Sequence, residues 1–394
     1  MQRFTIIEGW RAILAWWVVL SHMMGNSGFD KSQIKKESRN AEDLGHVIAD
    51  WFQTLGYDIM FFARSGKIPV YVFVIISGFV ISHLLVQKRE RYDAYLVRRF
   101  FRLWPALFAV LLVFAGFQLA GAPLRDIESF WAHFMLEATM FHGIVPDQVM
   151  QDANSAISGP GWSISLEWQF YIVAPLIVGA FMMGGWRIAA LFAGLIACLA
   201  FGVLNTKQPE VMAEGLTWSE PAFLPQVIGF FALGMVSYAL MVKLQETEKP
   251  LRYGSSLVIV ALLLAFNFKG PEGNWLPIMI WAAIFASIFT SGSLIHIALD
   301  NPVFRWLGTI SYSTYITHMP VLIIVNQYLV RNIAERGTYE KVGYMILICT
   351  PLVLIVSALS YYFIEKPGIA IGRRIASKLT GKPREEFPQV QAPA

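Results

Sequence analysis

Apolar runs long enough to cross a lipid bilayer recur along this chain, and they restrict it to an all-α membrane protein. A transmembrane helix needs about 20 consecutive apolar residues. Charged residues make up 15% of the 394 residues and hydrophobic residues 56%, whereas a soluble globular domain carries about 25% charged residues. The runs predict about ten spans, near 5–25, 67–87, 103–121, 162–184, 187–204, 222–243, 254–268, 275–294, 306–329 and 342–364.

The distribution of basic residues predicts that both termini are cytoplasmic. Lys and Arg accumulate in cytoplasmic loops, and KRER at 88–91 and RRFFR at 98–102 lie between the second and third predicted spans. Residues 1–367 are expected to form one transmembrane domain. Residues 368–394 are expected to form a basic cytoplasmic tail, either against anionic lipid or disordered. The stretch 122–161 is expected to dip into the membrane rather than cross it.

The first predicted span carries three ionisable residues on one face. Successive helical residues turn by about 100°, so Glu8, Arg11 and His22 share a stripe. An arginine facing lipid costs about 2.5 kcal/mol or more. The stripe is therefore expected to face a protein interior or a watery cavity, where Glu8 can pair with Arg11. The alternative is a structural ion pair, with a histidine that reaches the outer surface.

Two further stretches have ordinary explanations when each is taken alone. Ser77 and Gly78, in VFVIISGFVIS, let a helix or a slender ligand approach closely, but helix packing explains them equally. Arg98, Arg99 and Arg102 stand just before the third predicted span. The planar guanidinium suits phosphate recognition, yet such residues also anchor the cytoplasmic side of a membrane protein.

The fourth span brings a carboxylate close to the outer side of the membrane. Ser163, Glu167 and Tyr171 follow one another at i,i+4, one turn apart on a single face, and Trp162 lies at the predicted interface. Glu167 and His22 reach similar depths, and a carboxylate can orient an imidazole that acts as a general base. Contact between these two side chains is a hypothesis at this point.

The ninth span holds the last polar cluster, in LGTISYSTYITHMPV. Tyr315 and His318 fall at i,i+3 near mid-membrane, and Tyr312 lies two turns below His318. His318 is either a second site residue or a histidine whose ring is satisfied by a neighbouring hydroxyl, and we favour the second interpretation. The sequence has no spacing typical of metal ligands.

Taken in order, these stretches resemble the acyltransferase 3 family of integral membrane O-acyltransferases, over about residues 4–367. The family pattern combines an acid-Gly-x-Arg motif and a later His with Ser-Gly-Phe, paired arginines before Pro, Trp-Ser-x-Ser-x-Glu with Phe-Tyr, and two closing motifs. The matching positions are Glu8, Gly9, Trp10, Arg11, His22, Phe73, Ser77, Gly78, Phe79, Arg99, Arg102, Pro105, Trp162, Ser163, Ser165, Glu167, Phe170, Tyr171, 311–318 and 363–367.

Two positions depart from that pattern. Glu8 stands where Asp is commoner, which keeps the charge. Trp168 stands where many members carry a second acidic residue, so the resemblance does not extend to a paired carboxylate there.

The resemblance implies transfer of an acyl group, most often acetyl, from cytoplasmic acyl-CoA to a hydroxyl of a surface or lipid-linked glycan. It also implies a bacterial inner membrane protein without tightly bound cofactor, metal or nucleic-acid partner. Arg99 and Arg102, with Arg98 as a further candidate, would hold the CoA phosphates. The pantetheine arm would then pass Arg11 and Ser77.

The resemblance further implies that His22 is the general base, and that Glu167 orients or assists it. A neutral imidazole suits that task. Direct attack of His22 on the thioester, giving an acyl-histidine, is a rival mechanism. The residues expected to contact the substrate or support the site are Glu8, Trp162, Ser163, Tyr171, Tyr312, Tyr315 and His318.

Two other functions are compatible with buried charge in about ten helices. A membrane transporter or flippase would usually show inverted repeats and broken helix pairs, and neither is visible in the sequence. The other is a scaffold subunit of a glycan-export complex that retains a relic site.

Overall fold

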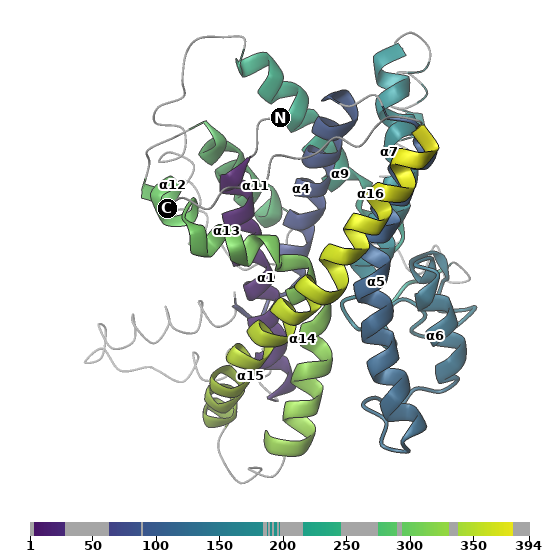
Figure 1. Ribbon diagram of the computed structural model, residues 1–394, viewed down its shortest axis with the longest axis vertical. Helices are drawn as coiled ribbons and strands as arrows, with labels where there is room; N and C mark the ends of the chain where they lie inside the picture. The colour runs from purple at the N-terminus through teal and green to yellow at the C-terminus, as the bar shows by residue number, and fades with distance from the viewer. Residues whose placement is uncertain are drawn as a thin grey trace, which may run out of the picture.

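The computed structural model describes most of the chain, namely residues 4–27, 63–87, 90–183, 216–245, 275–289, 294–330 and 338–380, with isolated positions between 187 and 197. Helices joined by turns and loops make up the whole of this part (Figure 1), which confirms the all-helical prediction for it. The predicted spans 187–204 and 254–268 lie outside the described residues, apart from those isolated positions, and so does the tail after residue 380.

The α-helices are α1 (Thr5–Asn26), α4 (Lys67–Gln87), α5 (Tyr92–Leu119), α6 (Phe130–Ala138), α7 (Trp162–Met183), α9 (Leu224–Gln245), α11 (Trp275–Ile288), α12 (Leu294–Leu299), α13 (Pro302–Thr309), α14 (Ser311–Val325), α15 (Thr338–Ser360) and α16 (Lys366–Thr380). Three short segments complete the list: a 3₁₀ turn at His142–Ile144 and π-helical turns at Asn326–Val330 and Tyr361–Glu365.

Five stretches of the described helices are long and apolar enough to cross a membrane. They are Lys67–Gln87, Tyr92–Leu119, Trp162–Ala180, Leu224–Val242 and Glu340–Thr380. The charged helix α1 is not among them. The structure therefore supports membrane spans at five places, while the ten spans and the cytoplasmic location of both termini stay predictions.

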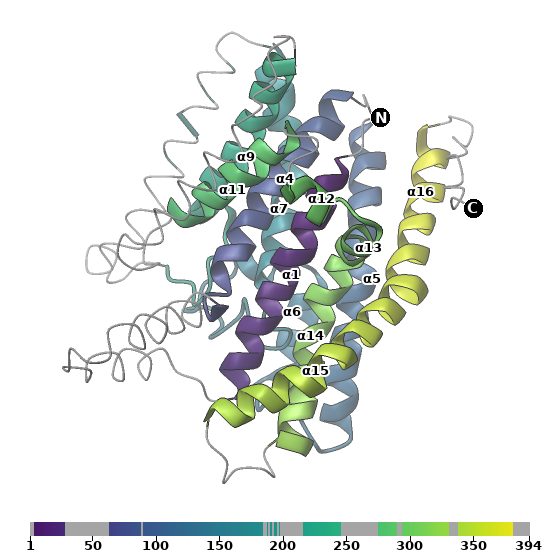
Figure 2. The ribbon, with the colours of Figure 1, turned by 90° about the vertical axis from the view of Figure 1, so that its left-hand side faces the viewer.

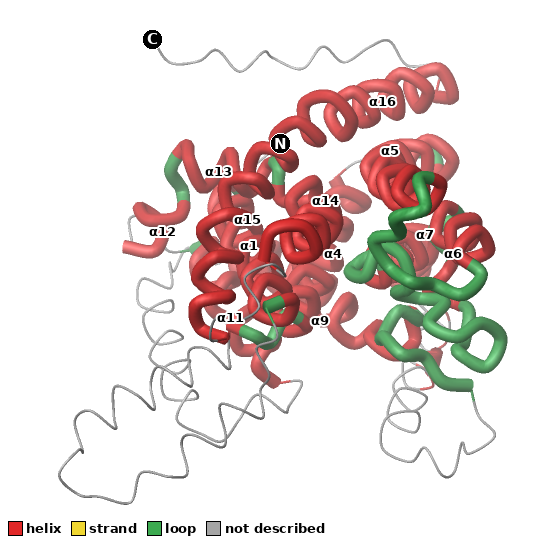
Figure 3. Tube along the Cα trace, turned by 90° about the horizontal axis from the view of Figure 1, so that it is seen from below, coloured by secondary structure: helices red, strands yellow, loops and turns green. Residues whose placement is uncertain are grey.

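Helix α1 runs through the middle of the bundle and packs against α4, α13 and α14 (Figures 2 and 3). Its buried positions are mostly small or β-branched, such as Ala15 and Val18. Glycines bring it against two neighbouring backbones. A Cβ added at Gly9 would collide with the carbonyl of Leu299, and one at Gly308 with the carbonyl of Glu8. Close backbone approach thus fixes the charged end of α1.

Helices α4 and α9 cross at a similarly short distance. A Cβ at Gly78 would collide with the carbonyl of Phe231, and one at Gly234 with that of Ile75. Small residues commonly permit such close crossings between membrane helices. The packing interpretation of Gly78 is therefore correct for this residue, while its neighbour Ser77 faces elsewhere.

Helix α5 begins at Tyr92, eleven residues earlier than the predicted span at 103–121, so that prediction of its start was wrong. The helix continues through Pro105, whose ring removes one backbone donor. Gly368 of α16 packs against this ring and the nearby carbonyl of Phe101. Arg98, Arg99 and Arg102 consequently lie inside a regular helix rather than in a loop before it.

The predicted ninth span at 306–329 is wrong in its outline. Helix α13 ends at Thr309, Ile310 has non-helical backbone angles, and α14 starts at Ser311. Asn301 caps α13 by accepting from two backbone N–H groups, with Pro302 at the first helical position, a favoured start. The break lets the polar face of α14 turn towards the bundle interior independently of α13.

The predicted tenth span at 342–364 is longer than expected. Helix α15, the π-helical turn and α16 follow without interruption from Thr338 to Thr380. The predicted domain boundary at 367/368 therefore falls inside α16. The segment predicted as tail begins as a helix that packs along α5 (Figure 1).

The stretch 122–161 forms the short α6 and the 3₁₀ turn rather than a membrane crossing. Nine residues of helix span about 14 Å, which is too short for a bilayer. The fully buried Glu137 fixes this region, because it accepts hydrogen bonds from Ile157 N, Ser158 N and Ser158 Oγ. Its immersion in the membrane stays a prediction.

We expect Gly234→Ala to lower the free energy of unfolding of the purified protein in detergent by about 1–3 kcal/mol, and with it the unfolding temperature. The new methyl group would force α4 and α9 apart. Gly116→Ala is the matched control, since an added Cβ there meets nothing within 4 Å and alanine favours helix. Equal unfolding temperatures for the two variants would contradict the close crossing.

Candidate active site

A cavity of about 290 Å³ lies between α1, α4, α5, α7, α9 and α14. Its polar lining comes from five of these helices: Glu8, Arg11, Ser77, His83, Arg99, Arg102, Ser163, Glu167, Tyr171, Ser311, Tyr312 and Tyr315. The volume is at the lower end of the range for small-molecule sites. The cavity is therefore suited to a slender ligand rather than to a bulky one.

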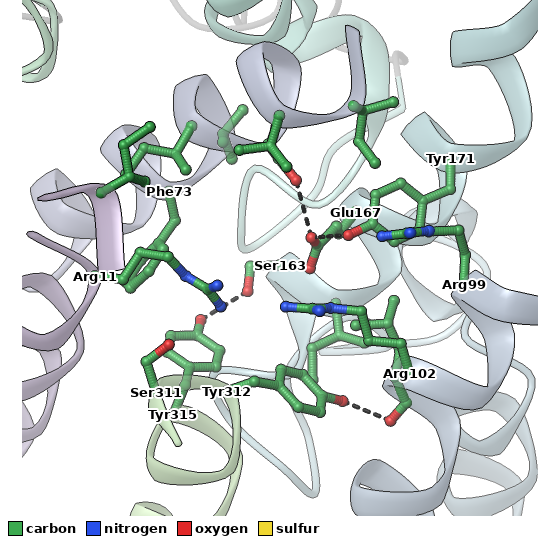
Figure 4. Close-up of a pocket in the computed structure, with 18 of the residues that line it drawn as sticks. Arg11, Phe73, Arg99, Arg102, Ser163, Glu167, Tyr171, Ser311, Tyr312 and Tyr315 are labelled. Atoms are coloured by element: carbon green, nitrogen blue, oxygen red, sulfur yellow. Dashed lines mark hydrogen bonds between the residues drawn. The ribbon is translucent and has the colours of Figure 1, made fainter. Parts of the chain in front are cut away.

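Guanidinium groups enter this cavity from two sides. Arg11 projects from α1, whereas Arg99 and Arg102 project from α5 (Figure 4). Arg99 lies over the rings of Tyr95 and Tyr171, with its Cζ 5.8 and 5.7 Å from the ring centroids. Its buried Nε atom has no hydrogen-bond partner among the described residues. The region is built to attract an anion.

Glu167 lies between these guanidinium groups and is held by two hydroxyls. Ser77 Oγ donates to Glu167 Oε1 at 2.9 Å, and Tyr171 OH donates to the same oxygen. The carboxylate acts electrostatically on both Arg11 and Arg102. The predicted face of Ser163, Glu167 and Tyr171 thus does line one cavity (Figure 4).

Tyrosines of α14 close the cavity floor. Tyr312 OH donates to the carbonyl of Leu103 at 2.5 Å. Tyr315 OH donates to the carbonyl of Pro160 at 2.9 Å and lies 2.7 Å from Ser163 Oγ. The ring of Tyr315 also lies 6.1 Å from that of His318, between ring centroids. Tyr315 therefore borders both the cavity and the histidine pair described next.

His22, near the C-terminal end of α1, and His318, in the middle of α14, form a pair. His318 Nε2 lies 3.4 Å from His22 Nδ1, and the ring centroids are 5.1 Å apart. His22 Nδ1 also donates to the carbonyl of Val18 at 2.9 Å, and His318 Nδ1 to that of Thr314 at 3.2 Å. Since a carbonyl only accepts, both Nδ1 atoms carry hydrogen.

For two neutral rings, these contacts define the tautomers of the pair. His318 Nε2 keeps its lone pair and accepts from His22 Nδ1–H, which it shares with Val18. The lone pair of a neutral His22 is then on Nε2. An imidazole held in this way is oriented to take a proton at Nε2.

A family model described as an acyltransferase domain matches residues 4–362 of the chain. The chain belongs to the acyltransferase 3 family. This membership agrees with the ordered motifs in the sequence, and together with the apolar helices it makes the chain an integral membrane protein.

Curated proteins similar to this family member carry names that point to O-acyl transfer. It is 26% identical over 340 residues to the "Putative peptidoglycan O-acetyltransferase YrhL" of Bacillus subtilis, covering 77% of this chain and 51% of YrhL. It is 26% identical over 328 residues to the "Putative membrane-bound transacylase BcsY" of Komagataeibacter xylinus, covering 78% and 77%.

A Staphylococcus aureus protein named "Putative O-acetyltransferase" is 24% identical over 334 residues, which cover 77% of this chain and 52% of that protein. The match therefore spans about half the length of YrhL and of the staphylococcal protein. No solved structure is significantly similar.

The structure brings together only part of the predicted site. The predicted contact between Glu167 and His22 is replaced in the described residues by contacts of Glu167 with Ser77 and Tyr171, and of His22 with His318. Glu8 and Arg11 line the cavity as the stripe predicted, but His22 lies beyond its lining.

Three other predicted residues have surroundings that the sequence did not indicate. Arg98 pairs with Glu90 at 2.8 Å and does not line the cavity. Trp162 is 6% exposed within the hydrophobic core, and its depth relative to the membrane interface stays a prediction. His318 is satisfied by a backbone carbonyl and by His22, not by a hydroxyl.

Sequence reasoning gave no role to Glu365 and His83. Glu365 is 2% exposed, accepts from Ser313 Oγ at 2.7 Å, and acts electrostatically on Arg102 and Arg11. The signal available was a carboxylate directly after an apolar run. His83 lines the cavity, and neither of its ring nitrogens has a partner among the described residues. The described residues contain no cluster suited to a metal ion.

We expect the cavity to contain water. In a protein lacking both native cysteines (Cys198→Ala and Cys349→Ala), Ser77→Cys should react with a water-soluble methanethiosulfonate reagent about tenfold faster, or more, than Ser82→Cys. Ser77 lines the cavity, so a thiol at this position would be reached by a reagent dissolved in cavity water. Ser82 lies on the same helix but is 4% exposed, bonded to the carbonyl of Gly78. Intact-mass spectrometry measures both rates, and equal rates would mean a dry cavity.

Proposed function

We propose that this chain transfers an acyl group, most simply acetyl, from cytoplasmic acyl-CoA to a hydroxyl of a surface or lipid-linked glycan at a bacterial plasma membrane. The observation that carries this proposal is the order in which the polar side chains follow one another in space. A cationic cavity containing Arg11, Arg99 and Arg102 is followed by Tyr315 and then by the pair of His22 and His318. Family membership supports acyl transfer as the chemistry.

The donor would enter from the arginine end. Guanidinium groups bind phosphate esters with paired hydrogen bonds, so Arg99 and Arg102 would hold the CoA phosphates. The small volume of the cavity suits the pantetheine arm, which would lie between Ser77 and Arg11. The thioester would then reach the region of Ser163 and Tyr315, next to the histidine pair.

The acceptor would react at His22. Nε2 of His22 would take the proton from the acceptor hydroxyl while the oxygen attacks the thioester carbonyl. The carbon–sulfur bond then breaks, and the CoA thiolate takes up the proton from the imidazolium, giving an ester and free CoA. Attack of His22 Nε2 itself on the thioester would use the same lone pair, with an acyl-histidine in between.

His318 would be the positioning residue for this base. Its Nε2 accepts from His22 Nδ1–H, which keeps the His22 proton on Nδ1 and the lone pair on Nε2. Glu167 would act from the donor side, as the counter-charge that keeps Arg11 and Arg102 in place, and through that position it would assist the transfer. From the sequence, Glu167 alone is expected to orient or assist His22. Here His318 would orient it, and Glu167 would assist from the donor side.

We expect His22→Ala to lower acetyl transfer from acetyl-CoA by about a hundredfold or more, while CoA binding measured by calorimetry stays intact. The base would be lost, but the arginine end of the cavity would be unchanged. Glycan uptake into vesicles without acyl-CoA turnover would instead indicate a transporter. Restoration of surface acylation in deletion cells by the His22→Ala variant would indicate a scaffold.

We expect His318→Ala to lower kcat about tenfold or more, with the KM for acetyl-CoA unchanged. The base His22 would lose its orientation, whereas the donor would keep all its contacts. His318→Gln should restore part of kcat, since its amide oxygen can accept the same hydrogen bond. His296→Ala is the control, as this histidine pairs with Asp300 away from the cavity. A raised KM with unchanged kcat would contradict the positioning role.

A further inference from the structure

Helix α16 lies beside the cationic end of the cavity, although it follows the last residue of the family match. The match ends at residue 362, and α16 covers Lys366–Thr380. Its place in the fold therefore says something about this chain that family membership does not.

The two helices α16 and α5 pack antiparallel along a seam of small residues. A Cβ at Gly368 would meet the Pro105 ring at 2.8 Å, and one at Gly372 would meet Phe101 Cβ at 2.6 Å. At the far end of the seam, Arg91 Nη1 donates to the carbonyl of Leu379 at 3.0 Å. Rising residue numbers in α16 thus match falling numbers in α5.

The seam determines where the neighbouring arginines point. Each residue of a helix is turned by about 100° from the one before it. In two antiparallel helices, the residues that directly follow the seam positions therefore point to the same side of the seam. Arg98 and Arg102 follow the seam positions Val97 and Phe101, and Arg373 follows Gly372. The three guanidinium groups therefore occupy one side of the contact.

The electrostatics agree with this placement. Arg98, Arg99 and Arg102 each act on the charge of Arg373. Arg98 is neutralised by Glu90, whereas the buried Nε of Arg99 has no hydrogen-bond partner among the described residues. Arg373 is exposed, so a soluble ligand has access to it. The positive charges of Arg102 and Arg373 on this side of the contact favour binding of an anion there.

We propose that Arg373 is a further binding residue for the phosphate groups of the donor, and that α16 forms one wall of their site at the cavity entrance. This inference rests on acyl-CoA as the proposed donor. CoA carries a diphosphate and a separate phosphomonoester, more charge than Arg99 and Arg102 alone would neutralise. A phosphate of a lipid headgroup has the same chemistry, and the experiment separates the two sources.

The test compares neighbouring residues of one helix. CoA is titrated calorimetrically into full-length protein in a neutral, lipid-free detergent. Arg373→Gln should weaken CoA binding about tenfold, the value of one lost charge-assisted hydrogen bond. Arg374→Gln removes the same charge one position along α16 and should leave the affinity unchanged. Arg373→Lys should lie between them, because it keeps the charge but loses the fork.

A second variant moves the helix without changing any charge. Gly372→Leu would push α16 away from Phe101 and should weaken CoA binding in the same way. S-acetylpantetheine, which carries no phosphate, should be turned over equally by wild type, Arg373→Gln and Arg374→Gln. Arg102→Ala serves as the positive control for loss of donor affinity.

Several outcomes would overturn the inference. One is equal CoA affinity in wild type and Arg373→Gln, and another is equal weakening in Arg373→Gln and Arg374→Gln. A third outcome concerns nanodiscs of phosphatidylcholine and phosphatidylglycerol. If the anionic lipid competes with CoA in wild type but not in Arg373→Gln, and Arg373→Gln does not change CoA affinity in detergent, the residue binds a lipid headgroup. Absence of CoA binding to wild type would reject the proposed donor itself, and the inference with it.

Discussion

The half-buried guanidinium groups of Arg11 and Arg102, which line the cavity inside the bundle, are the constraint on which the rest of the arrangement depends. An unpaired charge inside a protein costs several kcal/mol, and hydrocarbon penalises it further. The chain meets this constraint by bringing two carboxylates from distant parts of the sequence, Glu167 of α7 and Glu365 after α15, both of which act on both arginines. Four helical segments are thereby held around one polar centre.

Close helix packing is what allows that centre to be small. Glycines let α1 approach α12 and α13, and let α4 approach α9, at distances that no side chain would permit. Apolar packing alone provides little drive for association within lipid. The polar centre supplies specificity instead, because a register shift of any one helix would move a charged side chain away from the cavity. The narrow cavity and the cluster of charged side chains around it are two results of the same packing.

The sequence predicts the inward face of α1, and the face shared by Ser163, Glu167 and Tyr171, because helical periodicity fixes which residues align. It predicts the arginine end of α5 for the same reason. It does not predict the contact of His22 with His318, which are 296 positions apart, because periodicity says nothing of how two helices face each other. It also misses the break at Ile310 and the α5–α16 seam. Both depend on tertiary contacts of glycines. The sequence does not distinguish a glycine that packs against another helix from one that only interrupts its own helix.

The nature of the partner of His22 affects how the two ends of the proposed site, the histidine pair and the arginines, influence each other. A carboxylate next to this imidazole would favour its protonated form, and it would also be drawn to the arginines of the donor end. A neutral histidine as partner fixes the tautomer without adding charge. The counter-charge of the arginines, Glu167, can then remain with Ser77 and Tyr171. Because the proposed base and the proposed anion site have different partners, a change in the charge of the donor would leave the protonation of His22 unaffected.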